Sequence, residues 1–458
     1  MTLTSPAAKT FDLPGLAGTI LTPDDAGYDK ARTLVYGGID LRPGAIARVS
    51  TPDDIAGVIA YARENGLELA VRSGGHSSAG HSSTEGGIVI DVRSLKSIDI
   101  DPAARTAWAG AGNTAVELLA ALAPHKLAVG FGDAGTVGIS GITLGGGIGY
   151  LSRKLGLTVD AVLAFELVTA DGELITADAD NHPDLFWALR GGGGNFGVVT
   201  RIKFRLSPLE HFTGGMLLLP ATAETIAGFV RAAREAPEEL SSIAMVMPAP
   251  PMPFLPAEAH GKTVLLAMMA YAGDDDAAKA ALAPFRALAT PLADFVKPGP
   301  YAGMYPPEDP SQHPTIVSIN QFVNDIGIDE AETILGYLAE SDAQIRVCQI
   351  RVLGGAVARV PVEATAYPHR QSPIMLNYAA FYNGAEDQPG KLAWVRDFAK
   401  AMHQGEDGAY VNFVNDEGPE RVKAAYAYPG PTWDRLRRIK GQYDPDNVFR
   451  LNQNIPPA

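Results

Sequence analysis

The 458-residue chain contains a single cysteine, Cys348, and this scarcity excludes several classes of protein. One cysteine forms no intrachain disulfide, so a disulfide-stapled secreted scaffold is excluded. One cysteine also cannot supply the thiolates of a zinc or iron–sulfur cluster. We therefore expect a protein of the reducing cytoplasm without a metal site, and we expect Cys348 to lie in a hydrophobic core.

Positive charge is also in short supply. The chain has 37 Lys and Arg residues against 52 Asp and Glu, a net charge of −15. Nucleic acids and anionic membranes are bound mainly through Lys and Arg, so neither is an expected partner. The 46% of hydrophobic and 19% of charged residues are typical of a globular chain and not of a disordered one.

Long apolar runs are missing as well. No uninterrupted stretch reaches the ~18–20 residues that a membrane-spanning helix needs. The first ten residues contain no basic cluster followed by an apolar run, so we expect no signal peptide there. The apolar stretch from Met245 to Pro256 is rich in proline, and two interpretations stay open for it. It lines a lipophilic pocket, or it forms a rigid surface loop.

Glycine, in contrast, is abundant, and its clusters lie between residues 37 and 197. Helix and strand patterns between the clusters share no single period, which favours an α+β fold over a regular parallel sheet. Thr114 and Glu117 have the spacing of a capping box. The predicted helices cover residues 52–65, 114–122 and 184–189, and the predicted strands cover residues 69–72, 87–92 and 198–205.

The composition changes near residues 207–215, where glycine clusters become fewer and helical patterns longer. We predict a second domain there, with two or three helices over a sheet. The predicted helices cover residues 221–236, 276–288 and 329–340, and the strands cover residues 263–269, 344–352 and 374–381.

The segment Arg72–Ser77 reads Arg-Ser-Gly-Gly-His-Ser and directly follows a predicted strand. A Ser-Gly-Gly turn can point several backbone N–H groups into one concavity, and such a nest binds phosphate oxygens without lysine. The same glycines could merely serve a β-turn that needs positive φ. The hexapeptide alone leaves both interpretations open.

Two further glycine clusters follow. Residues 135–150 interleave glycine with Ile, Val and Leu, which permits close approach to a flat ligand and is not typical of a flexible linker. Gly192, Gly194 and Gly197 have the G-x-G-x-x-G spacing of a dinucleotide site. That site needs a strand before it and a helix after it. The predicted order here is the reverse, so we reject an NAD site.

Four motifs in sequence order resemble the berberine-bridge-enzyme-like branch of the vanillyl-alcohol-oxidase (PCMH-type) flavoprotein superfamily. They are Arg72–Ser77, Thr136–Asp160, Asp184–Thr200 and Tyr443–Pro457. The resemblance implies a PCMH-type FAD-binding domain of two α+β subdomains, closed by the C-terminal tail. It also implies a substrate domain whose antiparallel sheet is covered by helices. The corresponding boundaries are 1–207 with 411–458 for the first domain, and 208–410 for the second.

The resemblance also implies how FAD is held. His76 matches the position that binds the 8α-methyl group of the flavin covalently. Many relatives carry a second, cysteinyl link where this chain has Ala134, so we expect a link through His76 only. His81 has no motif support, and we assign it to the surface. The other residues implied at the cofactor are Arg72, Ser73, Gly74, Gly75, Ser77, Ala134, Gly135, Val137, Gly138, Ser140, Gly141, Gly145, Gly146, Gly147, Gly149, Val199, Asn412, Asn452 and Asn454.

Relatives transfer a hydride from a substrate carbon to flavin N5 while a base takes up a proton. The resemblance assigns that base to the second aromatic of a Tyr-x-Asn-Tyr stretch, and here that residue is Phe413, which accepts no proton. Candidate catalytic residues are Tyr410, Tyr150, Asn377 and Tyr378.

Each candidate has a weakness. On a strand, Tyr410 would face away from position 413, and Tyr378 would face away from Asn377. An amide such as Asn377 orients a substrate but is no base. A tyrosine base needs a pKa lowered well below ~10. We interpret Arg370, a possible source of positive charge, as a surface residue. An amine can also be oxidised from its neutral form without a strong base.

We therefore expect an FAD-dependent oxidoreductase acting on a small alcohol, amine or secondary-metabolite substrate, with O2 as the expected acceptor. We expect a monomer or homodimer. Two alternatives stay open. The first is a carbohydrate (oligosaccharide) oxidase, against which Ala134 counts because open sugar sites in relatives accompany a doubly tethered flavin. The second is a catalytically impaired flavin-binding protein, which Phe413 supports.

Overall fold

The computed structural model describes residues 11, 13–255, 257–427 and 430–458. The expectation about the first ten residues and the part of the 245–256 interpretation that concerns Pro256 lie outside these residues. Within the described part, no helix is both long enough and apolar enough to cross a membrane.

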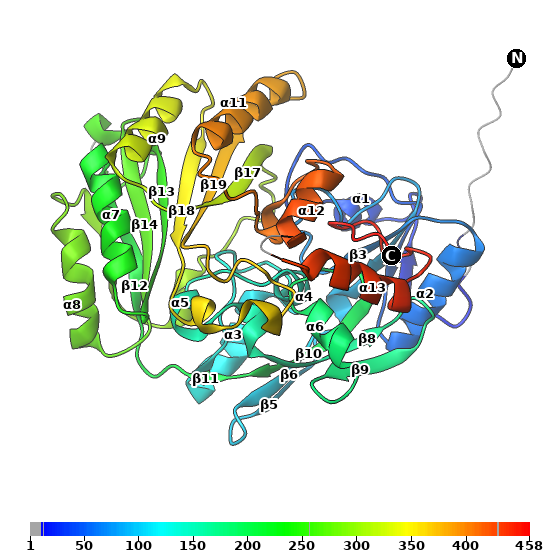
Figure 1. The fold of residues 1–458 in the computed structure, drawn as a ribbon. Helices are drawn as coiled ribbons and strands as arrows, with labels where there is room; N and C mark the ends of the chain where they lie inside the picture. Colours follow the sequence, from blue (N-terminus) through cyan, green and yellow to red (C-terminus); the bar gives the residue numbers. More distant parts are fainter. Residues whose placement is uncertain (1–10, 12, 256, 428–429) are drawn as a thin grey trace, which may run out of the picture.

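Two sheets and their helices form the N-terminal part of the molecule (Figure 1). The order β1-β2-β4-β3 is parallel except for β1, and the order β5-β6-β10-β8-β9 is antiparallel throughout. The bounds are β1 Thr19–Leu21, β2 Ala45–Arg48, β3 Leu69–Arg72, β4 Ile88–Asp91, β5 Ile98–Asp101, β6 Thr106–Gly110, β8 Val162–Val168, β9 Leu174–Asp178 and β10 Val198–Arg205. The predicted α+β class is confirmed.

Most helices of this part pack into the same hydrophobic core as the two sheets, whereas α1 packs on the other face of β2, β3 and β4 in a smaller core. The capping box predicted at Thr114 is present, since the Thr114 side chain and that of Glu117 each bond the other's backbone. A short pair, β7 (Leu127–Ala128) with β11 (Ser207–Pro208), ends the segment. The helices are α1 Tyr28–Arg32, α2 Pro52–Glu64, α3 Ala115–Leu122, α4 Ile139–Leu144, α5 Ser152–Leu155 and α6 Pro183–Leu189.

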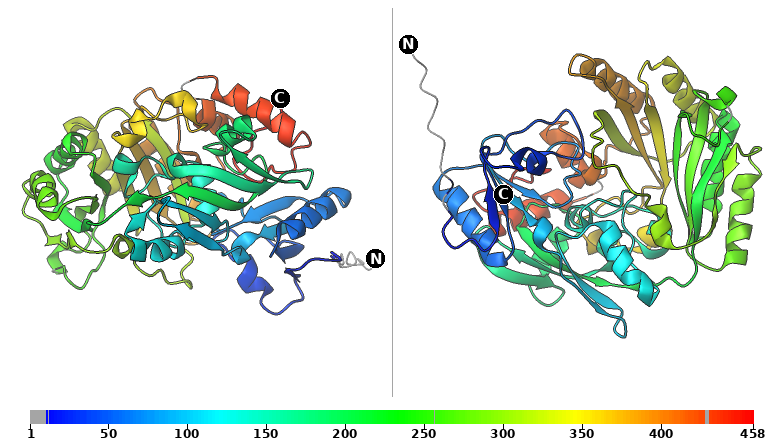
Figure 2. Two further views of the ribbon diagram at one scale, coloured as in Figure 1. Left: turned by 90° about the horizontal axis from the view of Figure 1, so that it is seen from below. Right: turned by 180° about the vertical axis from the view of Figure 1, so that it is seen from behind.

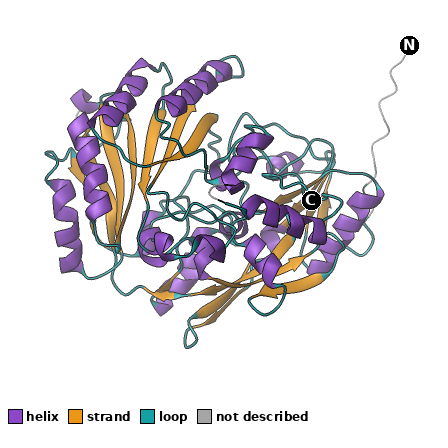
Figure 3. Cartoon of the chain, viewed as in Figure 1, coloured by secondary structure: helices purple, strands orange, loops and turns teal. Residues whose placement is uncertain are grey.

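An eight-stranded antiparallel sheet dominates the rest of the chain (Figures 1 and 3). Its order is β15-β12-β14-β13-β18-β19-β17, with β16 also paired to β12. The bounds are β12 Thr213–Pro220, β13 Leu240–Pro248, β14 Thr263–Tyr271, β15 Ala293–Asp294, β16 Lys297–Pro298, β17 Ile316–Val323, β18 Arg346–Val352 and β19 Ile374–Phe381.

Four helices cover the outer face of this sheet, more than the two or three that we predicted (Figure 2). They are α7 Ala223–Glu235, α8 Asp275–Arg286, α9 Ile328–Glu340 and α11 Gln388–Ala401. The core between sheet and helices contains Cys348, whose burial confirms its predicted place. The predicted antiparallel sheet under helices is confirmed, while the boundaries at 207/208 and 410/411 stay a prediction.

The C-terminal segment returns to the N-terminal part (Figure 1). It contains α12 (Pro419–Ala427) and α13 (Thr432–Tyr443), and the short α10 (Ala356–Arg359) precedes it in the chain. The fully buried Lys440 ammonium donates to the Asn195 and Phe449 carbonyls and pairs with Asp444 at 2.6 Å. These bonds attach the tail to the loop that follows α6.

Arg370 is buried, so its assignment to the surface is wrong. Its guanidinium makes two bonds to the Asp160 carboxylate, at 2.7 and 2.8 Å, and a third to the Thr365 hydroxyl. A charge can be buried when a carboxylate compensates it. Asp160 lies 210 positions away in the chain. The sequence around Arg370 therefore could not indicate this partner.

Candidate active site

A cavity of about 580 Å³ lies between the glycine motifs and the inner face of the eight-stranded sheet. We call its two sides the glycine end and the sheet end. The glycine end is formed by lining residues from segments 73–82, 137–144 and 193–199, and the sheet end by lining residues from β13, β17, β18 and β19. The volume lies in the range of small-molecule and cofactor pockets.

At the glycine end, the backbone of several glycines forms part of the cavity wall. A Cβ atom on Gly74 would lie 2.3 Å from the Gly138 nitrogen, and one on Gly138 would lie 2.1 Å from Ser73 Oγ. Gly75 has a φ of +73°, a conformation that side chains rarely adopt. The two predicted glycine motifs therefore touch through their backbones.

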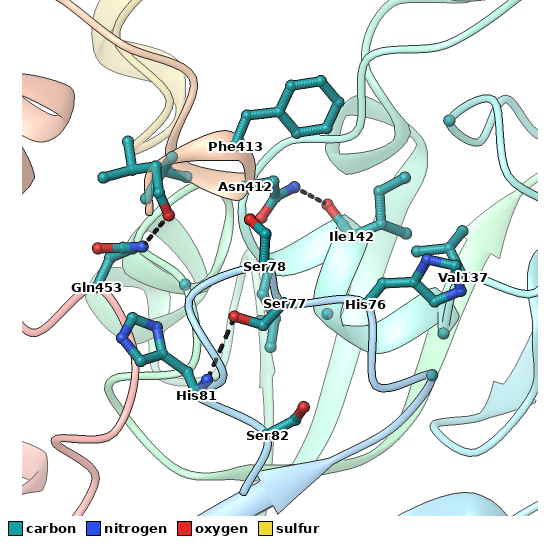
Figure 4. Close-up of a pocket in the computed structure, with 18 of the residues that line it drawn as sticks. His76, Ser77, Ser78, His81, Ser82, Val137, Ile142, Asn412, Phe413 and Gln453 are labelled. Atoms are coloured by element: carbon teal, nitrogen blue, oxygen red, sulfur yellow. Dashed lines mark hydrogen bonds between the residues drawn. The ribbon is translucent and has the colours of Figure 1, made fainter. Parts of the chain in front are cut away.

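His76 follows this turn and lines the cavity beside Val137 (Figure 4). Its Nε2 atom lies 2.8 Å from Thr136 Oγ1. Burial lowers the pKa of His76, against the opposing fields of Glu308 and Asp133, so the neutral imidazole is favoured.

His81 also lines the cavity, so its assignment to the surface is wrong. The loop after His76 bends back along the cavity, and the His81 N–H lies 3.4 Å from Ser77 Oγ (Figure 4). Ser78 and Ser82 from the same loop line the cavity too. Burial lowers the pKa of His81.

Of the residues predicted at the cofactor, most line the cavity and the rest support it. The lining residues are Ser73, Gly74, Gly75, His76, Ser77, Ala134, Val137, Gly138, Ser140, Gly141, Val199, Asn412 and Asn452. Outside the lining lie Arg72, Gly135, Gly145, Gly146, Gly147, Gly149 and Asn454.

Two of the outer residues show why a motif residue need not line the cavity. The buried Arg72 guanidinium donates to the carbonyls of Ser82, Ala31 and Arg32, which attaches the loop to α1. A Cβ atom on Gly145 would lie 2.0 Å from Asn412 Oδ1, so this glycine makes room for a lining side chain.

Tyr410 and Phe413 lie side by side, with ring centres 5.2 Å apart, and both line the cavity. We expected a strand that would separate them, and that expectation is wrong. Residues Val411–Phe413 form a 3₁₀ helix instead. Three residues make one turn of such a helix, so positions 410 and 413 share a side.

The Tyr410 oxygen already accepts three hydrogen bonds. The donors are the backbone N–H groups of Gly147 and Ile148, at 3.0 and 3.2 Å, and Asn412 Nδ2 at 2.8 Å. Burial raises the pKa of Tyr410, although these hydrogen bonds oppose the rise. Tyr410 thus holds the glycine-rich turn and Asn412 in place.

Tyr150 and Tyr378 lie outside the cavity lining. The Tyr150 ring packs edge-on against Tyr305, with centres 5.6 Å apart. The Tyr378 hydroxyl accepts a bond from Gln321, and its ring lies in the core between the eight-stranded sheet and its helices. Burial raises the pKa of both tyrosines. Tyr378 therefore faces away from Asn377, which lines the cavity.

At the sheet end the wall consists of alternate side chains from neighbouring strands. Gln349 on β18 is paired in register with Asn377 on β19, and both line the cavity. In the part of the chain that the structure describes, no group bonds Asn377 Oδ1, although this oxygen is buried. An amide oxygen of this kind is an acceptor for a ligand N–H or O–H group.

Arg351 carries a positive charge at the sheet end. Its guanidinium pairs with Asp133 at 2.6 Å, donates to Gln349 Oε1 at 2.9 Å, and lies 5.0 Å from the Phe413 ring centre. The pair with Asp133 joins the sheet to the segment just before residues 137–144 and neutralises both charges within the cavity.

Much of this lining was not predicted from the sequence. Met245 lines the cavity, whereas Phe254 is exposed in the loop after β13, so each interpretation of that stretch held for part of it. Two of the glycines with Rossmann spacing, Gly194 and Gly197, line the cavity, although the order of strand and helix around them excludes an NAD site. The sequence feature that could have identified the sheet end is the alternation of cavity-lining and core residues along β18 and β19. The missed lining residues include Tyr36, Ser78, His81, Ser82, Asp133, Gly193, Gly194, Gly197, Ile316, Ser318, Val347, Gln349, Arg351, Ala379 and Gln453.

The glycine end fits a flavin dinucleotide. Glycine backbone and short serine side chains make up much of its wall, and a flat ring and a pyrophosphate can both approach backbone closely. Among the described residues, the buried Ser82 Oγ and Asn452 Oδ1 atoms have no protein partner and line the cavity. Such groups normally have a hydrogen-bond partner, and a bound ligand would supply it.

Comparison with known proteins agrees with this geometry. The family described as "FAD binding domain" matches residues 43–178, and the family described as "Berberine and berberine like" matches residues 409–456. The chain is 30% identical to the (R)-6-hydroxynicotine oxidase of Paenarthrobacter nicotinovorans, over 96% of this chain and 97% of that protein. It is also 30% identical, with the same coverage, to the uncharacterized FAD-linked oxidoreductase YgaK of Bacillus subtilis (strain 168).

A solved structure extends the comparison to the fold. The 6-hydroxy-D-nicotine oxidase of Arthrobacter nicotinovorans matches with a TM-score of 0.86 at 27% identity, over 97% of this chain and 98% of that one. The fold is thus shared over nearly the whole length of both chains. The chain belongs to the berberine-bridge-enzyme-like family of PCMH-type FAD-linked oxidoreductases, and FAD is its cofactor.

Proposed function

We propose that this protein is an oxidase that takes a hydride from a small amine, with FAD attached through His76 alone and O2 as the acceptor. The observation that carries the proposal is the continuity of the cavity. Residues of the glycine motifs and residues of the sheet line the same space. A ligand at the sheet end would therefore contact a flavin at the glycine end directly.

FAD, when bound, supplies a hydride acceptor at flavin N5. The protein's part is to hold the substrate carbon against it. Several apolar side chains at the sheet end, among them Met245, Val347 and Ala379, exclude water from that position. Asn377 Oδ1 offers an acceptor for the substrate N–H group.

The fate of the substrate proton favours an amine over an alcohol. Phe413 accepts no proton, and the Tyr410 oxygen has three donors and a raised pKa. The lining carboxylate Asp133 is already paired with Arg351. A neutral amine needs no base before it loses a hydride, because its nitrogen lone pair stabilises the cation that forms. The similarity to (R)-6-hydroxynicotine oxidase supports the same class.

A single tether is consistent with the lining of the cavity. Ala134 lies in the cavity wall and offers no sulfur, and the one cysteine, Cys348, is buried in the core behind the sheet. Burial raises the pKa of the Cys348 thiol, which keeps it unreactive. Of the two flavin-attachment positions that the family resemblance implies, 76 and 134, position 76 is then the one that carries a nucleophile.

Anaerobic mixing tests the proposed function. The purified holoenzyme is mixed with panels of amines, alcohols and sugars, and the loss of yellow flavin absorbance is followed. We expect reduction by one or more amines at least ten times faster than by any alcohol or sugar. Reduction by sugars alone would overturn the amine assignment, and no reduction by any compound would favour a flavin-binding protein without oxidase activity.

A carbohydrate oxidase is the second candidate. The chain is 29% identical to the xylooligosaccharide oxidase of Thermothelomyces thermophilus, over 91% of this chain and 88% of that protein. Ala134 argues against it, because open sugar sites in relatives accompany a doubly tethered flavin. The sugar panel in the same experiment distinguishes the two candidates.

A further inference from the structure

A chain of three polar side chains crosses from the cavity to the protein surface. His76 Nε2 lies 2.8 Å from Thr136 Oγ1, and Thr136 Oγ1 lies 2.5 Å from Glu308 Oε2. The other oxygen of Glu308 accepts the Gly135 N–H at 3.0 Å. Glu308 is exposed and comes from the segment between β16 and β17, far from the other two residues in sequence.

The hydrogen bonds in this chain have one consistent direction. A threonine hydroxyl has a single hydrogen, and an ionised carboxylate only accepts. Thr136 therefore donates to Glu308 and accepts from His76, so the His76 hydrogen is on Nε2. The lone pair of the imidazole is then on Nδ1. The lowered pKa of His76 agrees with a neutral ring.

We propose that Thr136 and Glu308 are positioning residues for the covalent attachment of FAD. They present Nδ1 of His76 as the attacking atom, and they take up the proton that Nε2 gives up when the new bond forms. This inference rests on the proposed tether through His76. It adds a role for a residue of the second half of the chain, which none of the glycine motifs contains.

The attachment balances with O2 as the oxidant. One C–H bond of the 8α-methyl group and the N–H bond of His76 break, and one C–N bond forms. The two protons and two electrons released pass to O2, giving hydrogen peroxide. The imidazole nitrogen Nε2 is left without a hydrogen. Its proton moves to Thr136 as the Thr136 proton moves to Glu308, which is open to solvent.

Four variants test this role. In E308Q the amide oxygen can still accept from Gly135, but the side chain cannot take up a proton. T136V keeps the shape of the side chain without its hydroxyl group, and T136S keeps the hydroxyl group. D309N is the matched control, because Asp309 is an exposed neighbour whose bonds are to Ser311 and Gln312. Each protein is synthesised in a cell-free system supplied with excess FAD in air, and samples are taken over time.

The samples are precipitated in acid, and flavin is measured in the pellet and in the supernatant. We expect covalent flavin to form in the wild type, T136S and D309N at similar rates, and at least about ten times more slowly in E308Q and T136V. Total bound FAD before precipitation should stay within about twofold, which separates a positioning role from loss of the fold.

Two other results would contradict the inference in distinguishable ways. Wild-type rates in E308Q and T136V would overturn the role of the two residues while leaving the His76 tether intact. A wild type that releases all its flavin into the supernatant would overturn the tether, and the inference with it. If T136V fails to fold, the comparison of E308Q with D309N still decides.

Discussion

At the glycine end of the cavity, three short segments bring backbone into contact with backbone, and Gly74 and Gly138 leave no room for a Cβ atom. At the sheet end, the wall consists of single side chains, such as Gln349 and Asn377, that alternate with core residues along β18 and β19. The first construction suits a cofactor whose flat ring and phosphates approach backbone closely. The second can change one side chain at a time, and it is where substrate choice can vary without loss of the fold.

The largest effect is expected from a substitution at the glycine end. In G138A the new methyl group would lie 2.1 Å from Ser73 Oγ and 2.4 Å from the Gly74 nitrogen, so the two motifs must separate. We expect purified G138A to contain less than about a tenth of the wild-type flavin. The absorbance ratio of flavin to protein measures this loss.

The control for G138A is G57A, on α2, where a Cβ atom meets no other atom within 4 Å. G57A should keep its full flavin content, since alanine favours a helix. A G138A protein with normal flavin content would mean that the glycine end tolerates side chains, and the contrast between the two ends would fail.

A smaller effect is expected at the sheet end. N377L removes the amide oxygen that no described residue bonds, so a substrate N–H group would lose its acceptor. We expect KM for the best amine to rise about tenfold with flavin content unchanged, as for loss of one hydrogen bond. Steady-state kinetics measure KM.

Tyr378, the next residue on the strand, supplies the matched control because it faces the helices. Y378F should leave KM unchanged. Equal KM values for N377L and the wild type would show that the substrate does not bond position 377.

Tyr410 lies where the two ends meet, and its substitution should have a modest effect. In Y410F, the N–H groups of Gly147 and Ile148 lose their acceptor, but no proton acceptor for the substrate is removed. We expect the anaerobic rate of flavin reduction to fall less than about tenfold in stopped-flow measurements. A fall of ~10²-fold or more would identify Tyr410 as the base.

The smallest effect concerns His81 and pH. Burial lowers the pKa of His81 from its ordinary value of 6.5, while Asp416 opposes the shift, so the unfolded chain binds more protons near and below that pH. The stability that His81 contributes is therefore full above pH 6.5 and is lost as the pH falls. Between about pH 7.5 and 5.5, H81N should lose less thermal stability than the wild type, by about 1–2 °C.

Calorimetry or fluorescence melts at the two pH values measure this difference. Parallel losses in both proteins would mean that His81 keeps an ordinary pKa, and that this loop is more open to solvent than the glycine end as a whole.

The contrast between the ends also explains what the sequence could predict. The glycine end could be predicted because each of its loops consists of adjacent residues, such as Ser73 to Ser77, which form a contiguous sequence motif. The sheet end combines positions from four strands between residues 245 and 379, and only a known strand register brings Gln349 beside Asn377. The sequence did identify Asn377, but only through the family resemblance.

Three errors have separate physical causes. Arg370 was assigned to the surface because its partner Asp160 is remote in sequence. His81 was assigned to the surface because a loop that bends back has no periodicity to reveal it. The pair Tyr410 and Phe413 was separated because alternation holds on strands, whereas this segment is a 3₁₀ helix.

Peptide mapping of the wild-type protein after acid precipitation tests most directly whether the glycine end holds FAD through one histidine. We predict one flavin-bearing peptide, which contains His76, and no covalent flavin in H76A. Flavin found entirely in the supernatant, or attached at any other residue, would contradict the proposed attachment and the arrangement of the cavity built on it.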